Sequence, residues 1–330
     1  MTTSLTNIAT SAAAMPVDNG GFLPPNVIHA SNESRFAESF YSEPLTTYTA
    51  GWRDPSGVEQ TLNFIAPAVE VNRRFEYKTH NNAEAFLSET DDLRAAHASF
   101  KTVEYTGDSV MEKTHNKGLT IVVDLDNVPA ASADWRNLYT GRLLQRLYRN
   151  DLRRAVDALA AAAVNTAKTW DTTTGKDPDM DVIAELVTAT DATGVRPNRV
   201  LFGDTAWQKR ALSHRAQNNA GAYGSAALSP EAVAALLGVE GVHVSRERWQ
   251  SGASSKSQIV NNLVLMFYAL DNATTEDASH IKRFVSPTLA GTRTRVYEQQ
   301  LDAKRIALTV EHYSHIVVTS SIGIRKFTVS

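Results

Sequence analysis

The sequence of 330 residues contains no cysteine. This absence excludes disulfide bonds, thiolate zinc sites, iron–sulfur clusters and a cysteine nucleophile. No apolar run approaches the length of a membrane span, and the first lysine or arginine is Arg35, so the charged start of a secretory signal is missing. We therefore expect a protein that contacts no membrane and that is used in a cytoplasm or in an assembly formed there.

An excess of positive charge is also absent. Lysine and arginine number 33 against 36 aspartates and glutamates, which gives a net charge of -3 and a pI near 6.3. A generally basic nucleic-acid-binding protein is therefore excluded, and any contact with nucleic acid must come from a local patch. The hydrophobic content of 42% is ordinary for a soluble globular protein.

The most informative stretch predicts one very long helix. Asp134 is a good N-cap, and from Trp135 to about Lys168 there is no proline and only one glycine, Gly141. A helix of roughly 30 residues is close to 50 Å long, against a mean of about 11–12 residues. In a chain otherwise rich in short strands, such a helix is typical of an extended, flat subunit rather than of a compact enzyme.

This helix has two different faces. Small and apolar residues share one face: Leu144, Tyr148, Leu152, Ala155, Val156, Leu159, Ala162 and Ala163. The opposite face carries Asp157 and four arginines at spacings of four, three and four, namely Arg142, Arg146, Arg149 and Arg153. This arginine face is either a solvated or ion-paired surface, or a basic stripe that meets a polyanion.

The remaining pattern predicts an α+β protein. We expect strands at Leu62–Ile65 and Ala68–Val71, and a long hairpin over residues 75–106 that needs a partner to lie on. After the long helix we expect helices over 178–194 and 230–237, a helix capped by Asp204, and a loop over Gln217–Ser229. Further strands are expected at 199–202, 241–245 and 262–270 and over the last 40 residues, where 306–310 and 316–318 form separate runs.

No residue pattern predicts catalysis or a metal site. His312 and His315 are three apart on a predicted strand and so face opposite ways, and the other histidines have no ligand spacing. The pairs Asp91-Asp92 and Asp177-Asp179 lie in polar turns, where capping is the common role. Nucleophile-elbow, phosphate-loop and dinucleotide motifs are all missing, so we expect no enzyme and no cofactor.

Several segments in order resemble the major capsid proteins of tailed bacteriophages, which have the Hong Kong 97 capsid fold. Trp170-Asp171 after the long helix is similar to a turn of one branch of that family. The segments that carry the rest of the resemblance are Pro197–Gly203 with Trp207 and Leu212, Ala234–Val239 before Val242–Val244, and Arg305–Tyr313. Their order and spacing, from about residue 60 onward, carry the resemblance.

The resemblance implies a domain organisation. Residues 1–55 would form an N-terminal arm, for which an ordinary edge strand is the alternative, and 56–133 the peripheral-domain strands with an extended hairpin loop. Residues 134–175 would be the spine helix and its turn, 176–290 an axial α/β domain, and 291–330 the return strands of both domains.

The resemblance also implies a function. The chain would assemble with itself into hexamers and pentamers of an icosahedral shell around double-stranded DNA, as a virion capsid built in the host bacterial cytoplasm. Expected partners are a separate scaffolding protein, a portal and a decoration protein. The spine helix would lie towards the inside, so that Arg142, Arg146, Arg149 and Arg153 meet DNA phosphates without sequence preference. The alternatives are an encapsulin-like shell enclosing cargo, and a soluble enzyme.

Overall fold

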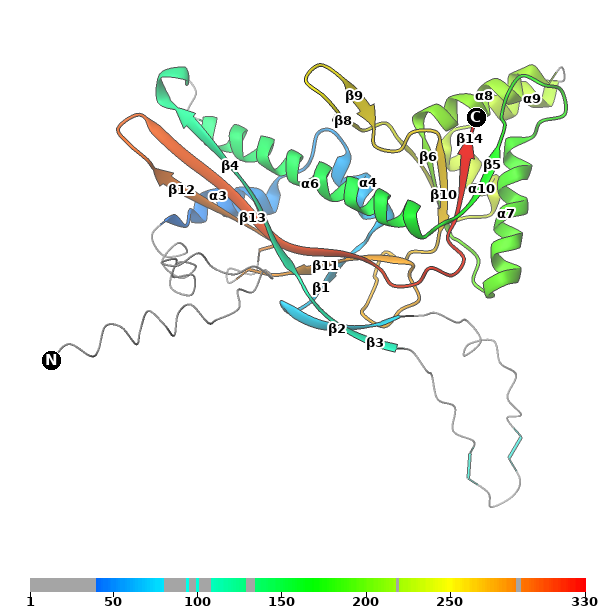
Figure 1. Cartoon of the computed structure of the whole chain (residues 1–330), viewed down its shortest axis with the longest axis horizontal. Helices are drawn as coiled ribbons and strands as arrows, with labels where there is room; N and C mark the ends of the chain where they lie inside the picture. Colours follow the sequence, from blue (N-terminus) through cyan, green and yellow to red (C-terminus); the bar gives the residue numbers. More distant parts are fainter. Residues whose placement is uncertain are drawn as a thin grey trace, which may run out of the picture.

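The computed structural model describes residues 40–79, 93–94, 99–100, 108–128, 134–217, 220–288 and 292–330. Most of the predicted arm and the far part of the predicted hairpin, including the expected strand up to Thr106, lie outside these residues. The described part is elongated (Figure 1). An α/β domain forms one end, and a long helix with long strands runs to the other.

The long strands belong to a peripheral sheet in which β13 is central. Its strands are β1 (Ala68–Glu70), β4 (His115–Asp124), β11 (Ile281–Ser286), β12 (Thr294–Gln300) and β13 (Arg305–Val318). β4 pairs along one side of β13, and β12 and β11 follow each other along the opposite side. The two runs expected at 306–310 and 316–318 are therefore one continuous strand of 14 residues. A short 3-10 helix, η1 (Leu125–Asn127), follows β4.

The predicted long helix is α6 (Trp135–Ala162), which has 28 residues and is about 42 Å long. Its apolar face packs on β13 and β4 (Figure 1). Near its start, Leu143 and Leu147 pack in a cluster with Leu308 of β13. Near its end, Leu152 and Leu159 pack in a second cluster that includes residues of the other sheet. One helix thus joins the two halves of the subunit.

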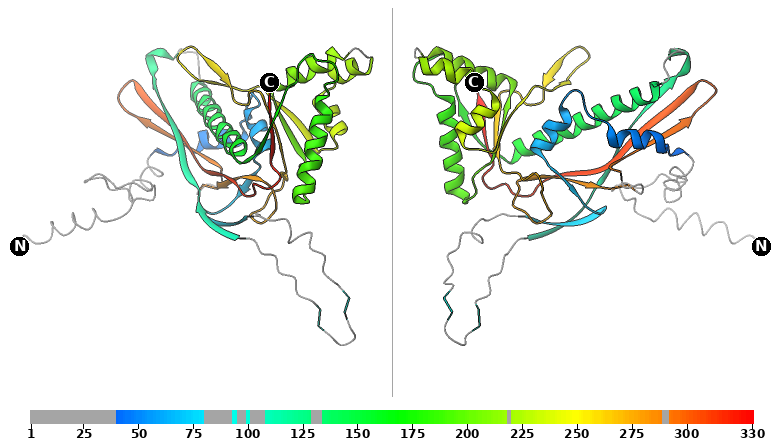
Figure 2. Two further views of the ribbon diagram at one scale, coloured as in Figure 1. Left: turned by 45° about the vertical axis from the view of Figure 1, so that its right-hand side comes forward. Right: turned by 180° about the vertical axis from the view of Figure 1, so that it is seen from behind.

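The second sheet and the helices around it form an α/β domain, which we call the axial domain after the expected division of the chain. Its strands, in spatial order, are β5 (Val164–Lys168), β14 (Arg325–Val329), β10 (Leu263–Phe267), β6 (Arg199–Gly203) and β7 (Gly241–Ser245). Around it lie α7 (Pro178–Thr193), α8 (Asp204–Ala216), α9 (Ala220–Ala226) and α10 (Pro230–Leu237), at the end of the molecule away from the β12–β13 tip (Figures 1 and 2).

Alternate residues of the axial strands face two different cores. Leu201 and Leu265 pack in the cluster that contains α6, whereas Phe202 and Met266 pack in the cluster that contains α7 and α10. Side chains of a strand point alternately to its two faces. All five residues of β6 are buried, which explains why Val200, Leu201 and Phe202 are apolar in succession without alternation.

Shorter helices and strands pack against α6 and the two sheets. α3 (Glu43–Gly51) packs on β12 and α6, and α4 (Val58–Ile65) packs on α6. β2 (Arg74–Thr79) pairs with β3 (Asp108–Lys113) and forms the base of the predicted hairpin, where Phe75 contacts Phe284 of β11 at a ring distance of 4.4 Å. β8 (Arg248–Gln250) and β9 (Lys256–Gln258) form a short hairpin that projects beside α6 (Figure 2).

The strand expected at Leu62–Ile65 is wrong, because these residues end helix α4. Val58, Leu62 and Ile65 share one buried face, which is helical spacing. The carboxylate of Asp54 caps the helix by accepting from the backbone N–H of Val58 at 2.8 Å. Asp54 lies four residues before the first helical residue, which is farther away than an ordinary N-cap signal.

The predicted end of the long helix, the predicted loop over 217–229 and two predicted caps also differ from the structure. The long helix ends at Ala162 rather than near Lys168, because residues 164–168 pair with β14 as strand β5. The expected loop over 217–229 contains helix α9. Asp134 occupies the N-cap position of α6, as predicted, but its side chain makes no cap hydrogen bond. Asp204 is the first residue of α8 rather than its N-cap, and it accepts from Arg248 instead.

His280 is buried where the two sheets meet, just before β11. Its Nδ1 accepts a hydrogen bond of 3.0 Å from the backbone N–H of Tyr268, which follows β10, and its carbonyl accepts one of 2.9 Å from Thr319, which follows β13. Burial lowers the pKa of His280 to about 4. The ring is therefore held neutral, since protonation would add a buried charge and remove the acceptor.

We predict that this histidine makes the folded chain sensitive to mild acid. Because its pKa is lower in the folded state than the usual value of about 6.5, the unfolded state binds more protons between these values. The contribution is complete above pH 6.5 and falls by about 3 kcal/mol as the pH drops to 4. Urea denaturation of the unassembled chain across this range should show a shallower pH dependence for His280→Asn, whereas His115→Asn, at an exposed position, should keep most of the slope.

Candidate functional site

The four predicted arginines lie on the face of α6 that turns away from the peripheral sheet. Arg142, Arg146 and Arg153 are exposed, and Arg149 is half-buried. The guanidinium of Arg142 lies 5.2 Å from the ring centre of Tyr139 on the same helix. The first two arginines therefore remain on an open helix surface.

The other two arginines approach the β8–β9 hairpin. The guanidinium of Arg153 stacks on the ring of Trp249 at 3.8 Å and lies 3.8 Å from the carboxylate of Asp157. Arg149 lines a cavity of about 460 Å³ between α6, the start of α4 and the hairpin. The structure thus divides the predicted stripe into an exposed pair and a pair that contacts a second element.

The cavity brings together basic residues that sequence reasoning missed. Its lining residues are Ser56, Val58, Arg149, Arg246, Glu247, Arg248, Trp249, Gln250 and Lys256. The sequence signal is Arg246 and Arg248, on either side of Glu247, followed by Lys256, but nothing local indicates that this segment lies beside α6. The side chain of Arg248 is held in an ion pair of 2.6 Å with Asp204 at the start of α8.

A buried polar cluster pins the inner face of α6 to the peripheral sheet. Asp151, which is 1% exposed, lies 2.9 Å from Lys117 of β4 and 3.0 Å from Nε2 of His312 of β13. Burial alone would raise the pKa of Asp151, but the hydrogen bonds and charges of His312 and Lys117 hold it well below its ordinary value. The carboxylate is therefore charged and paired on both sides.

This cluster contains a serine, a histidine and an aspartate, yet its geometry is not that of a catalytic triad. The same atom, Nε2 of His312, lies 3.0 Å from both Asp151 and Ser314. In a triad the aspartate orients one ring nitrogen so that the other can take the serine proton. Here the arrangement serves packing. His315 has different partners from His312, as expected for residues on opposite faces of a strand: it lies 2.6 Å from Glu112 of β3.

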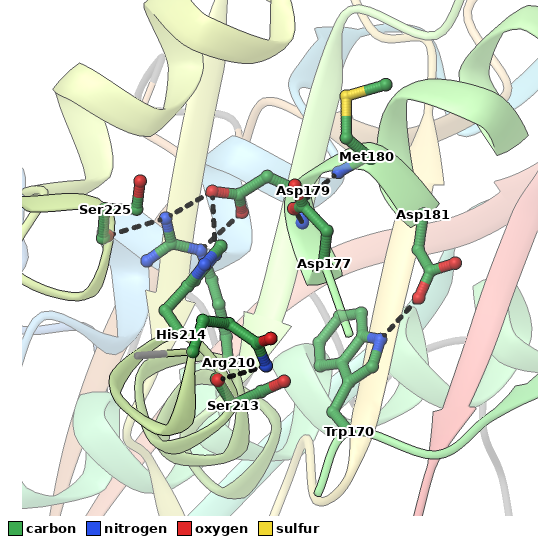
Figure 3. A network of polar contacts seen from close by, with 10 residues as sticks. Trp170, Asp177, Asp179, Met180, Asp181, Arg210, Ser213, His214 and Ser225 are labelled. Carbon is green, nitrogen blue, oxygen red and sulfur yellow. Dashed lines mark hydrogen bonds and ion pairs between the residues drawn. The ribbon is translucent and has the colours of Figure 1, made fainter. Parts of the chain in front are cut away.

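A second polar cluster holds the helices of the axial domain together (Figure 3). The guanidinium of Arg210 on α8 donates to both oxygens of Asp179 on α7, at 2.6 and 2.7 Å, and to the carbonyl of Ser225 on α9 at 3.1 Å. His214 lies 3.1 Å from the same carboxylate. Burial opposes ionisation of Asp179, but the hydrogen bonds of His214 and Arg210 outweigh it and lower its pKa.

This second cluster includes three groups with suitable atoms for a metal ion. Ligand atoms of Asp177, Asp179 and His214 lie within 4.8 Å of one another. However, both oxygens of Asp179 already accept from Arg210, and a guanidinium in that position repels a cation. Asp177 caps α7 by accepting from the backbone N–H groups of Asp179 and Met180, which is the role predicted for it. The arrangement fits an ion-pair network better than a metal site.

The sequence predicted no membrane-spanning segment, and among the described helices α6 is the longest. Within the described ranges, no helix combines the length and the apolar character that crossing a membrane requires.

We predict that Asp179→Asn destabilises the axial domain. Arg210 is fully buried, so removing its partner leaves an uncompensated charge, which costs about 3–5 kcal/mol of unfolding free energy. Urea denaturation of the unassembled chain measures the loss. The control is Asp157→Asn, which removes an exposed ion pair of 3.8 Å and should change stability by less than about 1 kcal/mol. Equal effects of the two changes would show that the cluster does not stabilise the domain.

Comparison with solved structures identifies the fold. A phage-related protein from Bordetella bronchiseptica superposes with a TM-score of 0.65 at 18% identity, covering 87% of this chain and 97% of that chain. A chain of Gordonia phage Cozz superposes with a TM-score of 0.52 at 12% identity, covering 84% of this chain and 89% of that chain. The sequence matches no family model and no curated protein. With its spine helix, hairpin base, axial α/β domain and return strands, the chain has the Hong Kong 97 capsid fold of phage major capsid proteins.

Proposed function

We propose that this protein is the major capsid protein of a tailed phage and assembles into hexamers and pentamers around double-stranded DNA. The fold is the observation that carries the proposal. Its polar clusters support a structural rather than an enzymatic role, because the two buried carboxylates with the most contacts, Asp151 and Asp179, are engaged in ion pairs between elements. The proposed location is the virion capsid, assembled in the cytoplasm of a bacterial host.

The surface of the single chain also supports assembly. The paired strands β2 and β3 lead into the proposed hairpin loop, and a hairpin that projects from a subunit needs a partner to lie on. Met111 of β3, Val122 of β4 and Leu138 of α6 are 78%, 52% and 51% exposed. Contacts with other copies of the chain would cover such side chains. A separate scaffolding protein, a portal and a decoration protein are the further partners in this proposal.

The domain division is part of the proposal, with a shorter arm than the sequence suggested. Residues 43–51 form α3, in which the hydroxyl of Thr46 accepts from the backbone N–H of Val296 on β12 at 3.2 Å. Leu45 is buried in the peripheral core. We therefore assign residues 1–39 to the arm and α3 to the peripheral domain.

The test of this function is electron microscopy of the full-length chain, expressed alone and with the scaffolding protein. We expect closed, symmetric shells. Removal of residues 1–39 should abolish or misdirect assembly and leave the subunit folded, whereas removal of residues 1–51 should also destabilise the subunit because α3 is lost. Normal particles without residues 1–39 would rule out the arm. A small oligomer under every condition would rule out the shell, and shells filled with a cargo enzyme instead of DNA would indicate a nanocompartment.

The arginine face of α6 is proposed to meet the packaged DNA. Phosphate contacts of this kind weaken as salt rises and carry no sequence preference. Replacing Arg142, Arg146, Arg149 and Arg153 together with glutamine should leave empty shells intact and make full particles lose their genome at lower temperature. The matched variant with four lysines keeps the charge and should retain the genome more nearly like the wild type. Equal genome retention by all three proteins across salt concentrations would make the stripe purely structural.

A further inference from the structure

The cavity between α6 and the β8–β9 hairpin has an unusual balance of charge. Four of its lining residues are basic and one is acidic. The acidic residue, Glu247, already accepts hydrogen bonds from the hydroxyls of Thr61 at 2.5 Å and Ser245 at 2.6 Å. Arg248 is paired with Asp204. Within the part of the chain that the structure describes, Arg149, Arg246 and Lys256 have no carboxylate within 4.0 Å.

The side chain of Arg149 has a hydrogen-bond donor without an acceptor. Its Nε is buried from solvent and has no hydrogen-bond partner among the described residues. A buried donor without an acceptor is unfavourable, and in native structures it calls for an explanation such as a missing ligand. Because Arg149 also lines the cavity, its guanidinium group is placed to turn toward an oxyanion bound there and donate to it.

The walls of the cavity are held in place by contacts outside it. The guanidinium of Arg153 stacks on Trp249, which fixes the hairpin against α6. The pair between Arg248 and Asp204 fixes the hairpin against α8. When a ligand binds to a site whose walls are already ordered, little free energy is lost in ordering those side chains.

The size and surroundings favour phosphate over carboxylate. A volume of about 460 Å³ lies in the range of small-molecule sites and exceeds what one carboxylate needs. Guanidinium groups bind phosphate oxygens through charge-assisted hydrogen bonds, and several cations can share one phosphate. The exposed Arg142 and Arg146 continue along the same face of α6. A polyanion with closely spaced phosphates can contact them and the cavity together.

We propose that this cavity is a phosphate-binding site in which Arg149 from the spine helix and Arg246 and Lys256 from the hairpin region hold a backbone phosphate of nucleic acid. Packaged DNA as the source of that phosphate rests on the proposed function. The site itself rests on the cavity, its charge balance and the unpaired Arg149.

The test measures binding of a short double-stranded DNA of mixed sequence to the unassembled full-length chain by fluorescence anisotropy over a range of salt. The variant Arg246→Gln/Lys256→Gln removes two exposed cations of the cavity without touching α6. Its binding should weaken, and the slope of log affinity against log salt should fall by about one for each phosphate that the variant no longer neutralises. Pyrophosphate should compete for the wild-type site. The control, Lys176→Gln/Arg215→Gln, removes two cations outside the cavity and should leave the slope unchanged.

Three outcomes of the binding experiment would overturn the proposed site. An unchanged slope in the cavity variant, or an equal drop in the control, would show that the cavity takes no phosphate. Stronger competition by an oligoglutamate peptide than by pyrophosphate would assign the cavity to an acidic protein segment. The proposed function is tested separately by microscopy, since closed shells with an unresponsive cavity refute only the site. Cavity binding by a chain that never closes into shells refutes only the function.

Discussion

The packing of helix α6 on strand β13 is the contact on which the rest of the structure depends. The first half of the helix contributes to the peripheral core, and its second half contributes to the core beneath the axial sheet. Asp151 fixes the register between helix and sheet, because its buried carboxylate is paired with Lys117 and His312 from two neighbouring strands. Breaking such a pair leaves an uncompensated charge, so the helix cannot slide along the sheet without a large cost.

The two faces of α6 use charge in opposite ways. On the inner face, Asp151 is satisfied within the subunit and contributes to folding. On the outer face, the arginines have few acidic partners: Asp157 lies near Arg153, and the open surface around Arg142 and Arg146 is left for other molecules. A subunit built on such a helix can be held together by one face and present the other, as the proposed shell function needs.

Local patterns in the sequence predicted much of the fold. The buried and exposed faces of α6 follow from residue spacing. The bounds of α7 and of α10 follow from the proline that begins each helix and the glycine that ends it. The errors have physical causes. Residues 164–168 contain no proline or glycine that would end a helix, but they pair with β14 as a strand. Val164, Asn165 and Thr166 are weak helix formers, so pairing with a distant strand decides their conformation. The last four residues of α4 are too few to show a helical period, which becomes visible only from Val58 onward.

The sequence by itself determined the class of the fold, the spine helix and the arginine face. The two faces of the helix could be predicted because a helical repeat of 3.6 residues depends only on residues close together in the sequence. Only the tertiary structure decided what those arginines meet. It separated Arg149 and Arg153 from Arg142 and Arg146 by placing Trp249, Arg246 and Lys256 beside the helix. It also joined Asp179 to Arg210 and Asp151 to His312, residues that lie 31 and 161 positions apart. Contacts between such distant residues depend on how the elements pack, and no local pattern encodes that.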